Sequence, residues 1–104
     1  MSGSISRRRL AARIYDKCIV HCSRPVVGEG SENVFVNGRP AARLNDKIVP
    51  HLKPAGKKCV IHSTVIGQGS PKVFINGRPA AYFGSKLVAC TWIAQGSENV
   101  FWGI

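Results

Sequence analysis

Short stretches of alternating polar and apolar residues, each interrupted by a turn, run along this chain. In the stretch 33–36, alternation places Phe35 on the strand face opposite to its two neighbouring valines. The pair Asn37-Gly38 follows, which is the strongest short signal for a β-hairpin because both turn positions favour a positive φ. The pattern therefore predicts a strand over 33–36, a tight turn and a return strand over 39–44.

The chain repeats this pattern about three times, which must be recognised before any fold is assigned. The fullest copy covers 33–51 (NVFVNGRPAARLNDKIVPH), and a second covers 72–90 (KVFINGRPAAYFGSKLVAC). A shortened copy, RLAARIYDKCIVH, opens the chain at 9–21. A related block occurs at 30–35 and 96–101 as GSENVF, and at 69–74 as GSPKVF.

The remaining segments follow from the same comparison. We expect a first strand over 9–14, a repeated strand pattern over 65–75 and a return strand over 78–83. The segment 50–58 is an insertion rich in Lys, Pro and Gly, and is expected to be a loop. The apolar residues 100–102 predict a closing strand that pairs with an earlier one or covers an open edge.

Aligning the copies places His21, His51 and Cys90 in register. Equivalent positions of a threefold arrangement converge near its axis, and three imidazole or thiol donors meeting there favour a metal. A tetrahedral zinc site needs a fourth ligand, and His62, beyond the insertion, is the natural candidate. Asp16 and Asp46 precede the first two of these positions and are expected to cap turns by bonding backbone amides.

Two alternatives to this ligand set stay open. Each histidine taken alone fits an ordinary surface or core imidazole. The spacings Cys18-x3-Cys22 and Cys59-x2-His62 also resemble those of zinc fingers, so Cys18, Cys22 or Cys59 could replace a histidine. Ligands of this borderline type accept iron as well as zinc.

The length of 104 residues predicts a single domain over 1–104, with residues 1–8 as a flexible tail. Eleven Gly and six Pro are typical of a turn-rich all-β protein. No apolar run approaches the roughly 20 residues of a membrane-spanning helix, and the basic N-terminus lacks the apolar core of a signal peptide. Synthesis in the cytoplasm is expected, where four cysteines would be reduced thiols or ligands rather than disulfides.

A net charge of +10 raises nucleic-acid binding as an alternative function. Most basic residues follow the repeat, however, and no aromatic residues are interleaved with them as in single-strand binders. A basic surface that docks on an acidic partner is favoured. An enzyme is not expected, because no nucleophile motif is present and no acidic residue stands beside a candidate ligand to act as a general base.

These motifs resemble the PAAR-repeat family. The resemblance rests on Pro40-Ala41-Ala42-Arg43, the NGRPAA turns and the GS-x-x-VF blocks, and it covers residues 9–101. It implies an all-β, cone-shaped fold with pseudo-threefold symmetry and one metal, usually zinc, near the apex. The family's three His and one Cys correspond to His21, His51, His62 and Cys90. The chain departs from the pattern at Leu10, where the first copy lacks a hairpin turn, and at Tyr82 and Ser85, which replace Arg and Asp.

Members of that family cap the central spike of phage tails and type VI secretion machines. The resemblance implies one monomer seated on a trimeric β-helical spike, aiding mechanical penetration of a cell envelope without a membrane anchor. The expected contacts with the spike are the apolar residues of the three blocks: Val34, Val36, Val73, Ile75, Val100 and Trp102. The alternative for the three Phe residues of these blocks is that they fill the core.

Two settings fit such a tip. Because the chain ends at Ile104 without room for a toxin domain, and because it closes with AQGSENVF, assembly at the tip of a phage tail is favoured. The alternatives are a type VI secretion tip that carries effectors outside the cell, and a zinc-containing protein that binds nucleic acid.

Overall fold

A computed structural model describes residues 7–104, which form short strands, turns and bends without a helix, so the all-β prediction is confirmed. No helix able to cross a membrane is found in this part of the chain. The eight strands form four antiparallel pairs. They are β1 (Arg8–Leu10), β2 (Phe35–Val36), β3 (Arg39–Pro40), β4 (His51–Ala55), β5 (Lys58–His62), β6 (Phe74–Ile75), β7 (Arg78–Pro79) and β8 (Phe101–Gly103).

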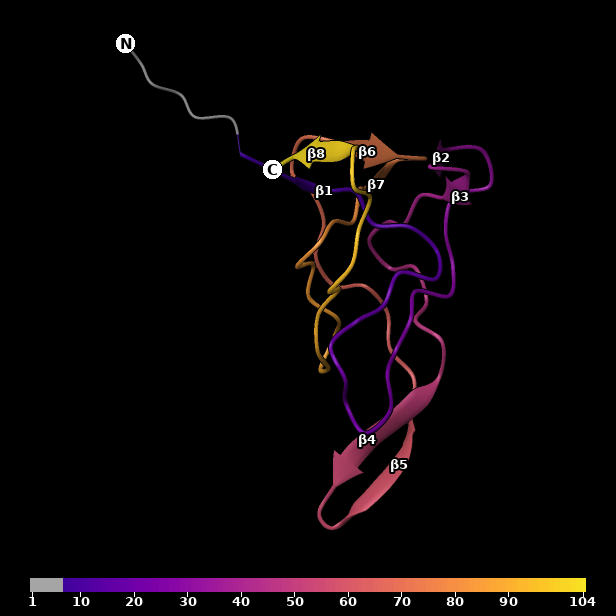
Figure 1. Ribbon diagram of the computed structural model, residues 1–104, viewed down its shortest axis with the longest axis vertical. Coiled ribbons are helices and arrows are strands. Elements are labelled where there is room, and N and C mark those ends of the chain that lie inside the picture. The colour runs from indigo at the N-terminus through magenta and orange to yellow at the C-terminus, as the bar shows by residue number, and fades with distance from the viewer. Residues whose placement is uncertain (1–6) are drawn as a thin grey trace.

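The molecule tapers from a broad end to a narrow end (Figure 1). Three strand pairs, β1–β8, β2–β3 and β6–β7, lie at the broad end, and we call their outer surface the broad face. The fourth pair, β4–β5, extends alone at the opposite end, and we call it the apical hairpin. The cone expected from the family resemblance is therefore present.

The two Asn-Gly turns have the backbone conformation that the sequence predicts. Asn37 and Gly38 have φ values of 53° and 77°, and Asn76 and Gly77 have 54° and 77°. Positive φ at both central residues defines a two-residue turn whose twist matches that of the flanking strands. A Cβ added to either glycine would meet no atom within 4 Å, so the positive φ, rather than crowding, requires glycine here.

The strands are shorter than predicted. The segments 9–14, 39–44, 65–75 and 78–83 enter regular pairs only at one end. Beyond those ends, the units leave their own hairpins and form single bridges with the neighbouring unit, for example Arg13↔Ala41 and Arg43↔Ala80. The hydrogen bonds of the extended segments therefore join the three units to each other.

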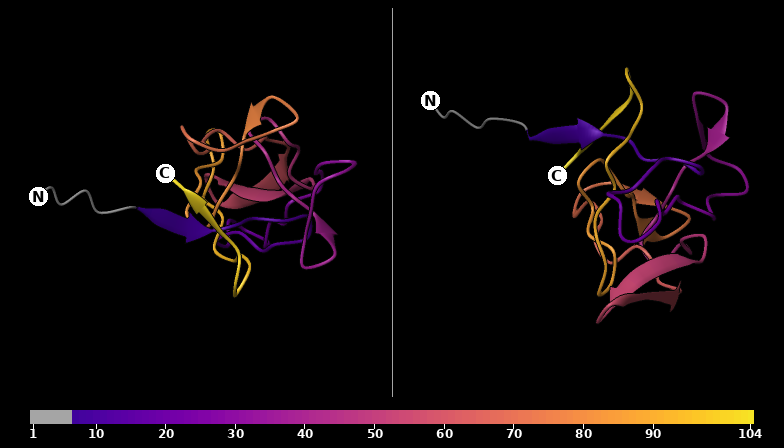
Figure 2. Two further views of the ribbon diagram at one scale, coloured as in Figure 1. Left: turned by 90° about the horizontal axis from the view of Figure 1, so that it is seen from above. Right: turned by 60° about the horizontal axis from the view of Figure 1, so that its bottom comes forward.

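The third pair of the broad face is made by the two ends of the chain. β1 pairs with β8 in the register Leu10↔Phe101, which corresponds to Phe35↔Pro40 and Phe74↔Pro79 in the other two pairs. The predicted pairing of 100–102 with an earlier strand is confirmed, and Figure 2 shows the three pairs around a common centre. The predicted tail falls mostly on residues 1–6, outside the described range, whereas Arg8 belongs to β1.

A closed ring of backbone hydrogen bonds marks the pseudo-threefold axis. The amide of Ala42 donates to the carbonyl of Ala12, Ala81 donates to Ala42, and Ala12 donates to Ala81, at 2.9, 2.9 and 3.1 Å. All three alanines are fully buried. The main core cluster surrounds them and contains Cys18 at the position where the other units have Ile48 and Leu87.

Asp16 and Asp46 cap their turns as predicted, and each also holds two arginines. The Asp46 carboxylate accepts bonds from the Arg43 backbone amide at 2.8 Å, from the Arg43 guanidinium at 3.0 and 2.9 Å, and from Arg78. Asp16 binds Arg13 and Arg39 in the same way. In the third unit, where Tyr82 and Ser85 replace the charged pair, the Ser85 hydroxyl accepts from the Tyr82 amide at 3.0 Å.

The insertion after His51 is not a loop, so that expectation is wrong. Residues 51–62 form the regular apical hairpin, with the register running from His51↔His62 to Ala55↔Lys58. Gly56 has a φ of 64° and supplies the turn. The clustering of Lys, Pro and Gly indicated a turn correctly, but it concealed that the flanking residues pair with one another.

Candidate metal centre

Four side chains converge at the base of the apical hairpin. His21, His51, His62 and Cys90 each offer one donor atom, and these atoms all lie within 4.8 Å of one another. This is the set expected from the register of the repeats and from the family resemblance. The four residues come from the two strands of this hairpin and from two other units, so a metal bound there would link the hairpin to both units.

Two of the donors come from the apical hairpin itself. His51 begins β4 and His62 ends β5, and the strand register places them directly opposite each other. Because opposed residues of an antiparallel pair project from the same face, both rings turn toward the same space. Their centroids lie 5.0 Å apart with the ring planes nearly perpendicular.

The other two donors are brought by bends of neighbouring units. His21 opens a bend that is held against β4, because the amides of Cys22 and Ser23 both donate to the Leu52 carbonyl. Cys90 follows Ala89, whose φ of 48° marks a tight turn. The Cys90 sulfur lies 2.9 Å from Nδ1 of His21 and 3.3 Å from Nε2 of His51.

The hydrogen bond of His51 and the lowered pKa values of the other two imidazoles suit these rings to metal binding. Nδ1 of His51 lies 3.0 Å from the Val49 carbonyl, an arrangement that places the ring proton on Nδ1 and leaves Nε2 free toward Cys90. The pKa of His21 is lowered mainly by burial and to a smaller extent by the nearby His51. The pKa of His62 is lowered mainly by burial and to a smaller extent by the positive charge of Lys53. Neutral imidazole is the form that binds metals.

This donor set fits a tetrahedral ion. Bond lengths to zinc place tetrahedral nitrogen and sulfur ligands roughly 3.3–3.8 Å from one another. The donor atoms here all lie within 4.8 Å of one another, and the Cys90 sulfur lies 3.3 Å from Nε2 of His51. Nε2 of His62 is also buried without a hydrogen-bond partner among the described residues. A buried polar atom without a partner is costly, and a ligand in this cluster would remove that cost.

The remaining cysteines do not enter the cluster. Cys22 and Cys59 form a disulfide with a Cα–Cα distance of 6.0 Å, so the expectation that all four thiols are reduced or ligating is wrong. Cys18 is fully buried in the core, and burial raises the pKa of its thiol to about 12. The zinc-finger-like alternative therefore has no support, because two of its sulfurs bind each other and the third is a core residue.

The broad face presents three equivalent aromatic side chains. Phe35, Phe74 and Phe101 are 55%, 57% and 42% exposed, so the alternative in which they fill the core is wrong. The six apolar residues that the sequence analysis assigned to a partner contact lie beneath them. Val36 and Ile75 are buried, and Val34, Val73, Val100 and Trp102 pack against the same second core cluster. The sequence alternation separated these two faces but did not indicate which one points outward.

Comparison with known proteins agrees with the repeat analysis. The family model of the PAAR motif matches residues 55–103, just under half of the chain. A segment of 31 residues is 58% identical to part of the protein named double-stranded DNA deaminase toxin A from Burkholderia cenocepacia strain H111. This segment is 30% of the present chain but only 2% of the toxin, so the chain spans a very small part of that relative.

Proposed function

Because this chain carries the PAAR motif, we propose that it is a non-enzymatic tip that seats as a single copy on the trimeric spike of a contractile injection machine. The broad face would contact the spike, and the apical hairpin would point away from it. In this position the tip would sharpen the spike and aid penetration of the target cell envelope.

The observation that carries this proposal is the threefold arrangement of one monomer's broad face. Three strand pairs with the same register surround the ring formed by Ala12, Ala42 and Ala81. A symmetric trimer has three equivalent chain ends, and a monomer can satisfy all of them only if it presents three equivalent contacts. Phe35, Phe74 and Phe101 supply those contacts as exposed aromatic side chains, a residue type enriched at protein interfaces.

The metal has a structural role in this proposal. With His21, His51, His62 and Cys90 as ligands, all four positions of a tetrahedral zinc are filled by protein atoms, which is typical of structural sites. Iron is the alternative ion for the same donors. The ion would join the apical hairpin to two neighbouring units at the narrow end, where a small fold has few core contacts to hold it.

Two settings use the same docking. The first is the tail of a phage. The similarity to part of a DNA deaminase toxin supports the alternative, in which the tip belongs to a type VI secretion machine that delivers effectors. Both settings require the same seat on a trimeric spike, so the docking experiment tests the shared part of the proposal.

Co-elution with a trimeric β-helical spike protein tests the function. The variant Phe35→Ser/Phe74→Ser/Phe101→Ser should lose the complex while keeping its metal, because the three side chains are exposed and lie far from the ligands. Ile61→Ser, which removes an exposed apolar residue from the apical hairpin, is the matched control and should bind as the parent does. Equal binding by the triple variant would refute docking through the broad face.

A further inference from the structure

The apical hairpin exposes an unusual amount of apolar surface for its size. β4 and β5 pair only with each other, and neither core cluster includes a residue from 52 to 61. Ile61 is 73% exposed and Val60 is 38% exposed. Within the described residues, Ile61 is the most exposed large hydrophobic side chain, and the fold does not use it to pack its interior.

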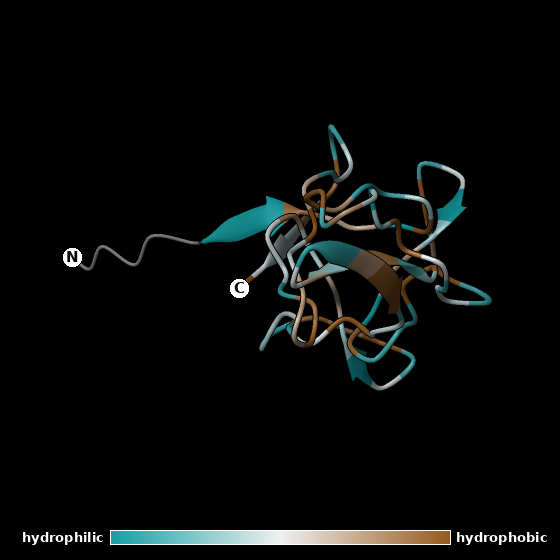
Figure 3. Ribbon diagram, turned by 90° about the horizontal axis from the view of Figure 1, so that it is seen from below, coloured by the Kyte–Doolittle hydropathy of each residue, from teal (hydrophilic) through white to brown (hydrophobic). Residues whose placement is uncertain are grey.

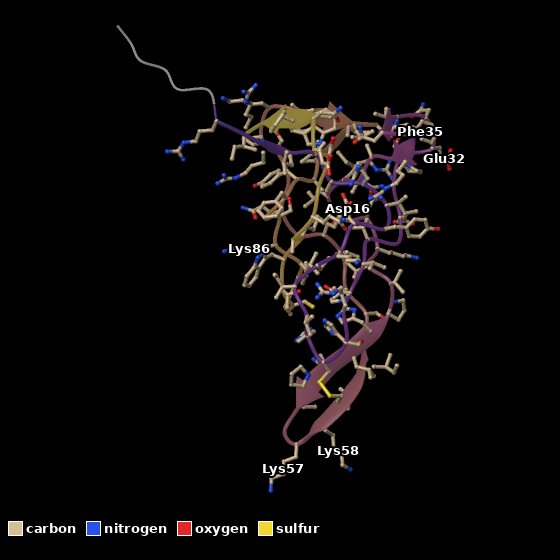
Figure 4. All side chains as sticks on the ribbon, in the orientation of Figure 1. Asp16, Glu32, Phe35, Lys57, Lys58 and Lys86 are labelled. Atoms are coloured by element: carbon tan, nitrogen blue, oxygen red, sulfur yellow. A yellow bond between two sulfur atoms is a disulfide. The ribbon has the colours of Figure 1, made fainter. Side chains whose placement is uncertain are left out.

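The hairpin is also positively charged. It carries Lys53, Lys57 and Lys58, and the segment 51–62 contains no Asp or Glu. None of the ion pairs found in residues 7–104 involves these lysines. Figure 4 places Lys57 and Lys58 at the far end of the narrow tip, whereas the acidic Glu32 lies at the broad end.

The strand register separates the two kinds of side chain only in part. Leu52 stands opposite Ile61, so these two apolar residues share one face of the hairpin. Lys53 stands opposite Val60 on the other face, which Ala55 and Lys58 also share. Seen from below, the hairpin lies over the middle of the molecule with hydrophobic and hydrophilic stretches along its strands (Figure 3).

A disulfide anchors this hairpin to the body. Cys59 of β5 is bonded to Cys22, and the Leu52 amide donates to the Ser23 hydroxyl at 2.9 Å. An anchored hairpin keeps its strands in place before any partner arrives, so less of the backbone has to be ordered on binding. The exposed isoleucine and the lysines therefore form a preorganised surface.

We propose that the apical hairpin binds the surface of an anionic lipid bilayer. The lysine ammonium groups would meet lipid phosphates, while Ile61 would enter the boundary between headgroups and acyl chains. The lysine stems can lie along that boundary with their charges in water. This deepens the proposed function, on which it rests, by identifying what the narrow end contacts first.

A lipid surface explains more of the hairpin than nucleic acid does. Phosphates of either kind would attract the lysines. Single-stranded nucleic acid, however, is bound on aromatic stacking platforms, and residues 51–62 contain no Phe, Tyr or Trp. An exposed aliphatic side chain such as Ile61 contributes nothing to a contact with a sugar-phosphate backbone, whereas it favours entry into a bilayer.

Vesicle flotation with the full metal-loaded chain tests this proposal. The protein should float with vesicles of equimolar phosphatidylglycerol and phosphatidylcholine and remain behind with pure phosphatidylcholine. Lys57→Gln/Lys58→Gln should weaken binding about twenty-five-fold, since each lysine near an anionic surface contributes about fivefold. Ile61→Ser should weaken it further, and Phe35→Ser on the broad face should not.

A control variant with the same net charge distinguishes binding by the apical hairpin from general electrostatic attraction between a basic protein and an anionic vesicle. Lys47→Gln/Lys86→Gln removes two exposed lysines outside the apical hairpin and lowers the net charge equally. Figure 4 shows Lys86 on the flank of the molecule, away from the narrow tip. This variant should retain nearly all of the parent's vesicle binding. Three outcomes would overturn the proposal. The two double variants could lose vesicle binding equally, or the protein could show no preference for the anionic vesicles. The protein could also fail to bind vesicles but bind duplex DNA in a way that depends on Lys57 and Lys58.

Failure of vesicle binding can be told apart from failure of the proposed function. Flotation uses the tip without a spike, and spike docking uses the opposite end of the molecule. A tip that docks on its spike but ignores anionic vesicles retains the proposed function and loses this inference. A tip that floats but forms no spike complex loses the proposed function on which the inference rests.

Discussion

His51 and His62 stand directly opposite each other at the base of the apical hairpin, with their ring centroids 5.0 Å apart. Both rings turn toward the space that His21 and Cys90 enter from neighbouring units. A metal held by all four would join the hairpin to the body at its base, just as the Cys22–Cys59 disulfide joins it further along β5.

Metal content should follow the cluster and not the other cysteines. Cys90→Ser removes one of four ligands and should lower the metal found by elemental analysis well below one ion per chain. Cys22→Ser/Cys59→Ser should leave it near one, because these sulfurs bind each other outside the cluster. The opposite pattern, with metal lost from the double variant and kept by Cys90→Ser, would favour a finger-like site.

Reduction should destabilise the protein through the disulfide. The Cys22–Cys59 bond spans a sequence separation of 37 residues, and closing a loop of that length contributes about 4 kcal/mol to the free energy of unfolding. Treatment with a reductant should lower the midpoint of urea unfolding for the parent but leave Cys22→Ser/Cys59→Ser unchanged. Four alkylatable thiols in the denatured, unreduced chain, instead of two, would show that the bond is absent.

Replacing a buried carboxylate should lower the free energy of unfolding more than replacing the neutral residue at the equivalent position of the third unit. Asp46→Asn leaves Arg43 and Arg78 without their anion and should cost about 3–5 kcal/mol, the usual penalty for breaking a buried ion pair. The equivalent change in the third unit, Ser85→Ala, removes one neutral hydrogen bond and should cost about 1 kcal/mol. Urea unfolding measures both, and equal costs would contradict the assigned roles.

Acid should release the metal and weaken the metal-free protein. Burial lowers the pKa of His21 and His62 below the ordinary value of 6.5. The unfolded chain therefore takes up protons first as the pH falls, so the metal-free fold loses stability from about pH 6.5 downward. Above that pH both states are neutral, and these two residues produce no slope.

Equilibrium dialysis across the same pH range measures the metal directly. Protons compete with the ion for imidazole nitrogen and thiolate sulfur, so retention should fall as the pH falls. If the protein keeps the same amount of metal as the pH falls from neutrality through the range in which histidine is protonated, histidine ligation is contradicted.

Local features of this fold were predictable from the sequence, and features that depend on register were not. Asn37-Gly38 specifies its own turn, and the repeat places equivalent residues in equivalent environments, which indicated His21, His51 and Cys90. His62 lies outside the repeat and was added only because a tetrahedral site needs a fourth ligand. The Cys22–Cys59 disulfide depends on how β4 and β5 pair and on which residue stands beside them. No local pattern reports that. The register also decided that Phe35 points outward.

The β1–β8 pair also shows which features the sequence indicated and which depended on pairing. The lack of a turn before Leu10 was visible in the sequence, and so was the spare apolar segment at 100–102. Their pairing follows from combining both observations, because an unpaired strand at one end of a repeat and another at the opposite end complete the missing unit. Strand lengths were overestimated because alternation continues past the point where each chain segment turns to the neighbouring unit.

The stoichiometry of the complex with a cognate trimeric spike tests the proposed function most directly. Native mass spectrometry of the mixture should show one copy of this chain bound to three spike chains, because the broad face already contains three equivalent strand pairs around one axis. Three tips per trimer, or no complex with the cognate spike, would contradict the proposal that a single tip caps the spike.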